Sequence, residues 1–242
     1  MSKILYLIYG GLAYAIGMGG LVFFILFIGS WDFMPVGIDS AIPSSIGIAM
    51  AMNIGLIALF GLQHTIMARP GFKKVWTTII PEPIERSSYV LLSGIIMLVI
   101  CLNWRAIDGV VWDFENSAIR TLFWALHLSG WVIMVIATFL INHFELFGLS
   151  QVWGNFKKLP EPEVAYTEKF LYKLVRHPIQ LGVLIGIWFT PTMSMTHLHL
   201  SILMTVYVFI GLHYEEIDLT DSLGDQYADY KTRVRKIIPL PK

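Results

Sequence analysis

Long stretches without a charged residue divide this chain. No Asp, Glu, Lys or Arg occurs in the intervals 4–31, 40–68, 87–104 and 121–144. A helix needs about 20 mainly apolar residues to cross the hydrocarbon core of a bilayer, and each interval is near that length or exceeds it. The pattern therefore predicts membrane-spanning helices at about residues 4–29, 45–67, 87–103 and 119–142.

A further uncharged interval, 177–214, is too long for one span and suits two short ones. Pro191 and the polar residues Ser194, Thr196, His197 and His199 predict a turn inside it. We therefore expect six spans, the last two near 179–195 and 198–214. The alternative is five spans, with one weak segment lying in the membrane interface.

The composition agrees with an all-α polytopic membrane bundle that forms a single domain over residues 1–242. Hydrophobic residues make up 56% of the chain and charged residues 14%, against roughly 25% charged in ordinary soluble proteins. The 17 basic and 17 acidic residues give a formal net charge of zero, whereas a nucleic-acid-binding protein carries a basic excess. With one cysteine, Cys101, the chain has no internal disulfide, and the sequence predicts no metal site.

Lys and Arg positions predict the orientation of the bundle. With six spans, both termini share a side that carries every Lys and Arg except Arg105 and Arg120, which is 15 of the 17. Because cytoplasmic loops of membrane proteins are enriched in Lys and Arg, we expect both termini in the cytoplasm, in a bacterial inner membrane. Lipids are then natural partners, and the sequence makes no prediction of the oligomeric state.

Polar side chains gather at the predicted cytoplasmic span ends. They are Gln63 and His64; Asn142, His143 and Glu145; Arg176, His177 and Gln180; and Tyr214, Glu215 and Glu216. Polar groups in spans are costly and usually face a cavity or a partner. Each has a simpler interpretation as an interhelical hydrogen bond or an interfacial anchor, and Gly182-x-x-x-Gly186 is typical of helix packing. Together they predict a site open to the cytoplasm.

The last two spans form a hairpin, which predicts a clamp with two charges. Arg176 and His177 supply donors for an anionic group, beside the free N–H groups of a helix start. Gly182, one turn deeper, lets a flat ring approach the backbone. Glu215 and Glu216 can accept hydrogen bonds from an ammonium or from ribose hydroxyls. A ligand with a carboxylate, an ammonium, a ribose and an aromatic base fits this pattern.

The C-terminal motif resembles a known superfamily. Arg176-His177-Pro178-x-x-x-Gly182, then Glu215-Glu216, Gly224-x-x-Tyr227-x-x-Tyr230 and a basic run are similar to the isoprenylcysteine carboxyl methyltransferases and phospholipid methyltransferases. The resemblance covers roughly residues 170–240 and implies an S-adenosylmethionine site at the cytoplasmic face, in a cofactor-binding half over 143–242. The residues it implies are Arg176, His177, Pro178, Gln180, Gly182, Tyr214, Glu215 and Glu216. Gln180 departs from the Tyr that the superfamily often has there.

Three other segments resemble a narrower group. Residues 61–70, 81–87 and 142–152 are similar to bacterial methanethiol S-methyltransferases, which convert methanethiol to dimethyl sulfide. With the C-terminal motif, the resemblance spans nearly the whole chain. It implies a small thiol as the substrate of this enzyme.

In such a reaction a thiolate attacks the methyl group, and the thiolate rather than the thiol is the nucleophile. A base near the thiol promotes that step. The candidate catalytic residues are His64 and His143 as bases, with Tyr172 and Arg176 as polar helpers. The candidate substrate-binding residues are Gln63, Asn142 and Glu145, which could order the bases, and Phe144, which could line an apolar pocket.

Other functions remain as alternatives at this stage. The acceptor could be another thiol, a prenylcysteine or a lipid amine. Histidines in a six-span bundle also fit a haem-dependent membrane isomerase, with a pair such as His64 and His143 as iron ligands. A transporter or scaffold would leave the polar span ends unexplained.

Overall fold

The computed structural model describes residues 2–160 and 166–239. Its helices are α1 (Lys3–Gly29), η1 (Ile38–Ser40), α2 (Ile46–Ala68), α3 (Pro70–Trp76), η2 (Glu82–Ile84), α4 (Glu85–Asn103), α5 (Ser117–Ile141), α6 (His143–Leu146), α7 (Leu149–Lys157), α8 (Leu171–Leu174), α9 (Pro178–Trp188), α10 (Met195–Leu223) and α11 (Asp225–Arg233). Two strands, β1 (Val110–Asp113) and β2 (Thr192–Ser194), form an antiparallel pair.

The long apolar helices confirm the all-α membrane fold. Within the described residues, 5 helices are long and apolar enough to span a bilayer: α1, α2, α4 with the preceding η2, α5 and α10. Four of them match the spans predicted from the charge-free intervals. The chain is thus an integral membrane protein, because a helix satisfies its own backbone polar groups in hydrocarbon.

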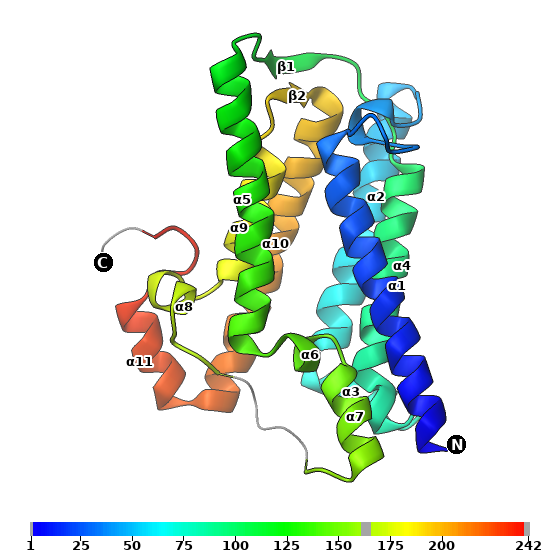
Figure 1. Cartoon of the computed structure of the whole chain (residues 1–242), viewed down its shortest axis with the longest axis vertical. Coiled ribbons are helices and arrows are strands. Elements are labelled where there is room, and N and C mark those ends of the chain that lie inside the picture. Colours follow the sequence, from blue (N-terminus) through cyan, green and yellow to red (C-terminus); the bar gives the residue numbers. More distant parts are fainter. Residues whose placement is uncertain (1, 161–165, 240–242) are drawn as a thin grey trace.

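The predicted fifth span, 179–195, is wrong as a full helical span. Helix α9 has 11 residues, which at 1.5 Å per residue extend about 16 Å, roughly half of the hydrocarbon core. Pro191 ends it, because a proline disfavours helical geometry in the residue before it. The chain continues to β2, which lies beside β1 at one end of the bundle (Figure 1). The predicted span 198–214 lies inside α10, which extends beyond it at both ends.

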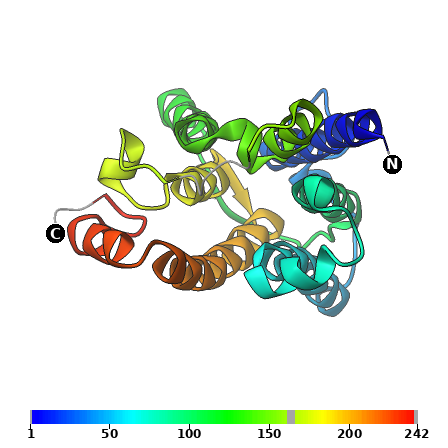
Figure 2. The same cartoon turned by 90° about the horizontal axis from the view of Figure 1, so that it is seen from below.

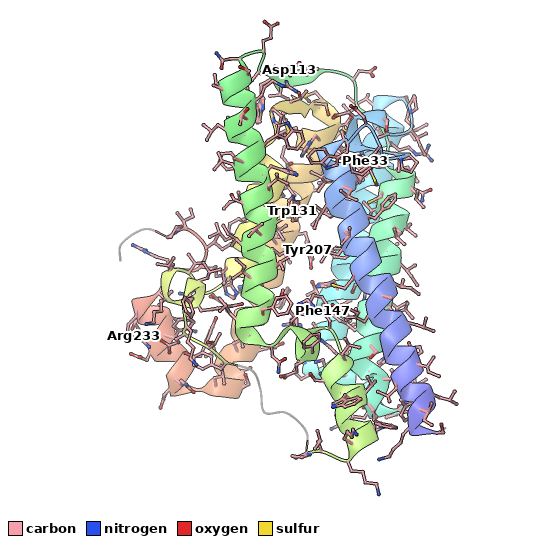
Figure 3. The ribbon with its side chains drawn as sticks, in the orientation of Figure 1. Phe33, Asp113, Trp131, Phe147, Tyr207 and Arg233 are labelled. Atoms are coloured by element: carbon pink, nitrogen blue, oxygen red, sulfur yellow. The ribbon has the colours of Figure 1, made fainter. Side chains whose placement is uncertain are left out.

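The short elements divide between the two ends of the bundle. Strands β1 and β2 lie at one end, and α3, α6, α7, α8 and α11 lie in the other half (Figure 1). Viewed from that second end, the bundle is elongated, with α11 and the start of α1 at opposite extremes (Figure 2). Trp131 is buried, and Tyr207 and Phe147, labelled with it in Figure 3, are partly buried against hydrophobic clusters.

Glycines bring α9 directly against α5. A Cβ added at Gly182 would lie 2.5 Å from the Gly130 carbonyl oxygen, and one added at Gly130 would lie 2.5 Å from the Gly186 nitrogen. Small residues allow such backbone contact between membrane helices. The close approach at Gly182 is therefore that of α5, and the predicted approach of a flat ligand ring at this residue is not what the structure shows.

Two glycine variants test the close contact between α9 and α5. Gly182→Ala should destabilise the bundle by about 1–3 kcal/mol, because backbone atoms of α5 must move. Gly211→Ala in α10 should leave stability unchanged or raise it slightly, because a Cβ there meets nothing within 4 Å. Apparent melting temperatures in detergent measure both effects. Equal stability of the two variants would contradict the packing described here.

Candidate functional site

A cavity of about 720 Å³ opens in the half of the bundle that holds the short helices. This volume is in the usual range for small-molecule sites, about 300–1,000 Å³. Predicted residues that line it are Asn142, Glu145, Tyr172, Arg176, His177 and Glu215. Residues that sequence reasoning did not assign to a site also line it, notably Lys73, Glu85, Arg86, Gln151, Asn155, Tyr227 and Tyr230. The cavity therefore draws on residues before 143 as well.

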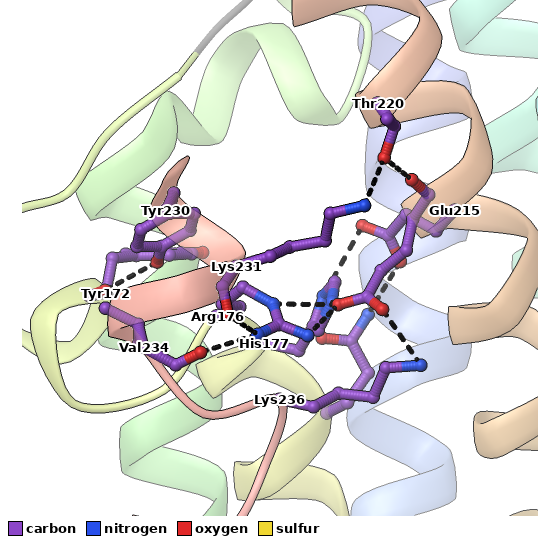
Figure 4. Close-up of polar contacts among 11 residues, drawn as sticks. Tyr172, Arg176, His177, Glu215, Thr220, Tyr230, Lys231, Val234 and Lys236 are labelled. Carbon is purple, nitrogen blue, oxygen red and sulfur yellow. Dashed lines mark hydrogen bonds and ion pairs between the residues drawn. The ribbon is translucent and has the colours of Figure 1, made fainter. Parts of the chain in front are cut away.

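Arg176 is paired inside the protein. Its Nε and Nη2 donate to Glu216 Oε1 at 2.8 and 2.6 Å, and its Nη1 donates to the Val234 carbonyl at 2.5 Å (Figure 4). The side chains of Arg176 and Glu216 are only 8% and 14% exposed. Glu216 thus neutralises the charge of the guanidinium, and a backbone carbonyl just after α11 accepts a hydrogen bond from its Nη1.

The C-terminal segment closes around this ion pair. Arg176 N–H donates to the Arg235 carbonyl at 2.8 Å, and His177 N–H donates to the Lys236 carbonyl at 3.1 Å. The Lys236 ammonium lies 3.1 Å from Glu216 Oε2. The basic run near the C-terminus therefore holds the Arg-His-Pro segment in place.

These contacts correct the predicted clamp. Arg176 and Glu216 bind each other instead of opposite ends of a ligand. Glu215 is 42% exposed and faces the cavity, where His177 Nδ1 lies 3.9 Å from its Oε1 and Gln180 donates to its Oε2 at 3.4 Å. His177 Nε2 lies 3.1 Å from Glu216 Oε1. Of the clamp residues that line the cavity, Glu215 is the most exposed, whereas the side chains of Arg176 and His177 are largely buried against Glu216.

Tyrosines form the wall next to this pair. Tyr172, Tyr227 and Tyr230 line the cavity, and the Tyr230 hydroxyl donates to the Tyr172 carbonyl at 2.5 Å. Burial raises the pKa of the Tyr172 and Tyr227 hydroxyls, and it raises the pKa of Tyr230 to about 12. All three stay protonated at neutral pH. Tyr172 and Tyr230 donate their hydroxyl protons to backbone carbonyls, and among the described residues the Tyr227 hydroxyl has no hydrogen-bond partner. The motif Gly224-x-x-Tyr227-x-x-Tyr230 was the sequence signal for two of them.

His64 is not among the residues that line the cavity, and its ring is held by Ser93. Its Nδ1 is 3.1 Å from Ser93 Oγ, which donates its own proton to the Tyr89 carbonyl at 2.8 Å or to Gln63 Oε1 at 3.3 Å. When Ser93 donates to either of these carbonyl oxygens, it accepts from His64 Nδ1–H, and Nε2 is then unprotonated in the neutral ring. The rings of Phe60 and Tyr89 have centroids 5.0 and 4.8 Å from that of His64.

His143 is held on both sides. Thr138 Oγ1 donates to the Val135 carbonyl and so accepts from His143 Nδ1–H at 2.9 Å, while Tyr14 donates to Nε2 at 2.9 Å. Burial lowers the pKa of His143, so its ring is neutral at pH 7. Because both ring nitrogens are hydrogen-bonded, the geometry disfavours haem ligation by this residue.

Several predicted residues do not line the cavity. Phe144 and Tyr214 are 52% and 47% exposed on the outer surface. Pro178 is buried where α9 begins, and Gln63 lies beside Ser93 and Met67. Asn142 does line it, while its side chain also caps α6 and donates to Glu145 Oε2 at 2.9 Å.

Comparison with known proteins adds independent information. The chain is 41% identical over 241 residues to methanethiol S-methyltransferase of Mycobacterium tuberculosis, covering 100% of this chain and 98% of that protein. It is 36% identical over 239 residues to methanethiol S-methyltransferase of Crocosphaera subtropica, covering 99% and 93%. A more distant similarity, 27% over 183 residues, covers 72% of this chain and 70% of nurim of Sus scrofa. No family model and no solved structure matches the chain.

Proposed function

The chain belongs to the methanethiol S-methyltransferase family, and from this premise we propose that it methylates methanethiol to dimethyl sulfide, with S-adenosylmethionine as the methyl donor. The observation that carries the proposal is the cavity of about 720 Å³, whose walls bear charges of both signs. Family membership makes the chain a thiol S-methyltransferase. The identity of the donor and the residues that bind it are our inference.

The cavity residues suit such a donor. S-Adenosylmethionine has a carboxylate, an ammonium, a ribose and a purine, and it supplies the methyl group from a sulfonium. Tyr172, Tyr227 and Tyr230 offer rings for a purine. Glu215 offers a carboxylate that can accept from ribose hydroxyls. Arg86 offers a guanidinium for an anionic group.

We assign the removal of the thiol proton to His64. Its unprotonated Nε2 can accept the proton as the thiol sulfur forms its bond to the methyl carbon, and Ser93 orients the ring through Nδ1. The rings around His64 exclude water, which leaves a thiolate weakly solvated and reactive. A small apolar thiol is the kind of acceptor that such surroundings accommodate.

We further propose that the cavity faces the cytoplasm of a bacterial inner membrane. The basic residues Lys73, Arg86 and Arg176, on the predicted cytoplasmic side, all line this cavity. Arg120, predicted on the opposite side, pairs with Asp113 of β1 at the other end of the bundle. The positive-inside rule then places the cavity on the cytoplasmic side.

Methyl transfer from donor labelled in its methyl group tests the function. We expect the purified full-length chain to release labelled dimethyl sulfide from methanethiol, and to act poorly on sulfide, a prenylcysteine or a lipid amine. Glu215→Gln should raise the donor concentration needed for half-maximal rate roughly tenfold, because it removes a charged hydrogen-bond acceptor. Glu115→Gln, exposed and on the opposite side, is its control.

Each acceptor serves as a control for the others, because all share the donor site. Faster methylation of any acceptor other than methanethiol would overturn the substrate assignment. An unchanged donor requirement in Glu215→Gln would overturn the assignment of Glu215 to the donor site.

A further inference from the structure

One wall of the cavity carries polar side-chain atoms that have no hydrogen-bond partner among the described residues. It is formed by Lys73 of α3, Glu85 and Arg86 of α4, and Gln151 and Asn155 of α7; we call it the α3–α4–α7 wall. Glu85 Oε1, Gln151 Oε1 and Asn155 Nδ2 are buried and have no hydrogen-bond partner among the described residues. Buried polar atoms in native proteins are nearly always bonded, so these atoms indicate a polar ligand.

Contacts at Nε and at the face of the guanidinium hold Arg86 in position and leave its two terminal nitrogens available to a ligand. Its Nε donates to the Leu146 carbonyl at 2.7 Å, and its guanidinium lies 4.7 Å from the centre of the Tyr89 ring. These contacts fix the plane of the group. Within the described part of the chain, Nη1 and Nη2 of Arg86 make no hydrogen bond to protein. Arg176, by contrast, donates hydrogen bonds from its guanidinium to Glu216 and to backbone carbonyls.

Charges of both signs lie together on this wall. Lys73 is half-buried, and burial together with the nearby Arg86 lowers the pKa of its ammonium, while Glu85 acts in the opposite direction. Among the described residues, the ammonium of Lys73 forms no hydrogen bond or ion pair. Two cations beside one carboxylate match a zwitterion better than a simple anion, because Glu85 would repel a phosphate.

We propose that the α3–α4–α7 wall binds the amino-acid end of the methyl donor, with Arg86 and Lys73 on its carboxylate and Glu85 on its ammonium. This rests on the proposed function and sets the orientation of the donor in the cavity. Gln151 and Asn155 complete the hydrogen bonding of the same two groups. The ribose and purine then lie at the opposite wall, near Glu215 and the tyrosines.

Two ligands that differ only in the amino-acid group test this orientation. S-Adenosylhomocysteine carries that group, and 5′-methylthioadenosine lacks it. With the full-length chain in lipid nanodiscs, we expect the wild type to bind S-adenosylhomocysteine more tightly. Arg86→Gln and Glu85→Gln should each weaken S-adenosylhomocysteine roughly tenfold or more, as expected for a lost charged hydrogen bond, and leave 5′-methylthioadenosine unchanged.

Controls keep the outcomes distinct. Lys74→Gln, exposed and next to Lys73 but outside the cavity, should alter neither affinity. Glu85→Gln keeps the shape of the side chain, so it remains informative if Arg86→Gln unfolds. Equal weakening of both ligands, or unchanged binding of S-adenosylhomocysteine, would overturn the orientation. If the wild type binds neither ligand, the proposed methyl donor is wrong, and the proposed orientation of that donor is wrong as well.

Discussion

Glu216→Ala should release the C-terminal segment and abolish donor binding. Glu216 accepts from Arg176, lies 3.1 Å from His177 Nε2 and pairs with Lys236. Its removal leaves the guanidinium of Arg176 buried without a counter-ion, which costs about 3–5 kcal/mol. We expect a lower apparent melting temperature and rapid trypsin cleavage between residues 231 and 236.

Two further variants separate this buried pair from an ordinary ion pair. Asp229→Ala removes a partner of Arg233 at the surface, where such pairs contribute about 0–1 kcal/mol, so melting should barely change. Arg176→Met combined with Glu216→Met should be less destabilised than Glu216→Ala, because no charge is left unpaired. A double variant whose destabilisation equals the sum of those of Arg176→Met and Glu216→Met alone would contradict the coupling of the two residues as a buried ion pair.

His64→Ala should lower turnover at pH 7 by about 10²–10⁴-fold, the usual contribution of a general base. Without His64, only the thiol fraction that is already ionised can react. The rate of the variant should therefore rise about tenfold per pH unit below the pKa of the thiol, roughly 8.5 for a free cysteine thiol. The wild type should show a nearly flat profile over the same range, measured as initial rates from pH 6.5 to 8.5.

Two other histidines provide the comparison. His213 is exposed on α10, and His213→Ala should keep full turnover. His143→Ala should lower stability through the lost contacts to Tyr14 and Thr138, without pH-dependent recovery of the rate. Recovery with rising pH in His143→Ala, together with full activity of His64→Ala, would transfer the role of base to His143.

The long spans could be predicted because each depends on a local property. Residues 4–29 and 121–142 lack charges over a sufficient length, and hydrocarbon admits only segments of that kind. The fifth span could not be predicted in this way. Its 11-residue helix is as apolar as the others, and its shortness depends on Pro191 and on the pairing of β2 with β1.

Part of the predicted set of site residues lies together in one cavity, and their roles stay predictions. His177, Glu215 and Tyr172 do line the cavity. Arg176 and Glu216 carry opposite charges, and they lie just before α9 and within α10. Two such residues can bind opposite ends of one ligand, or they can form an ion pair with each other. Sequence alone does not distinguish these, because the choice depends on tertiary contacts: the Lys231 and Val234 carbonyls accept from the guanidinium of Arg176, and the next carbonyls accept from backbone N–H groups of the Arg-His-Pro segment.

The sequence by itself determined that this chain crosses a membrane repeatedly, and its motifs identified the family. Both follow from order along the chain, since span length and motif spacing are read in one dimension. Only the tertiary structure decided which charges face the cavity and which neutralise each other. Buried charges take the partners that packing brings nearest, and packing brings Glu216 to Arg176 while it leaves Glu85 and Arg86 facing the cavity.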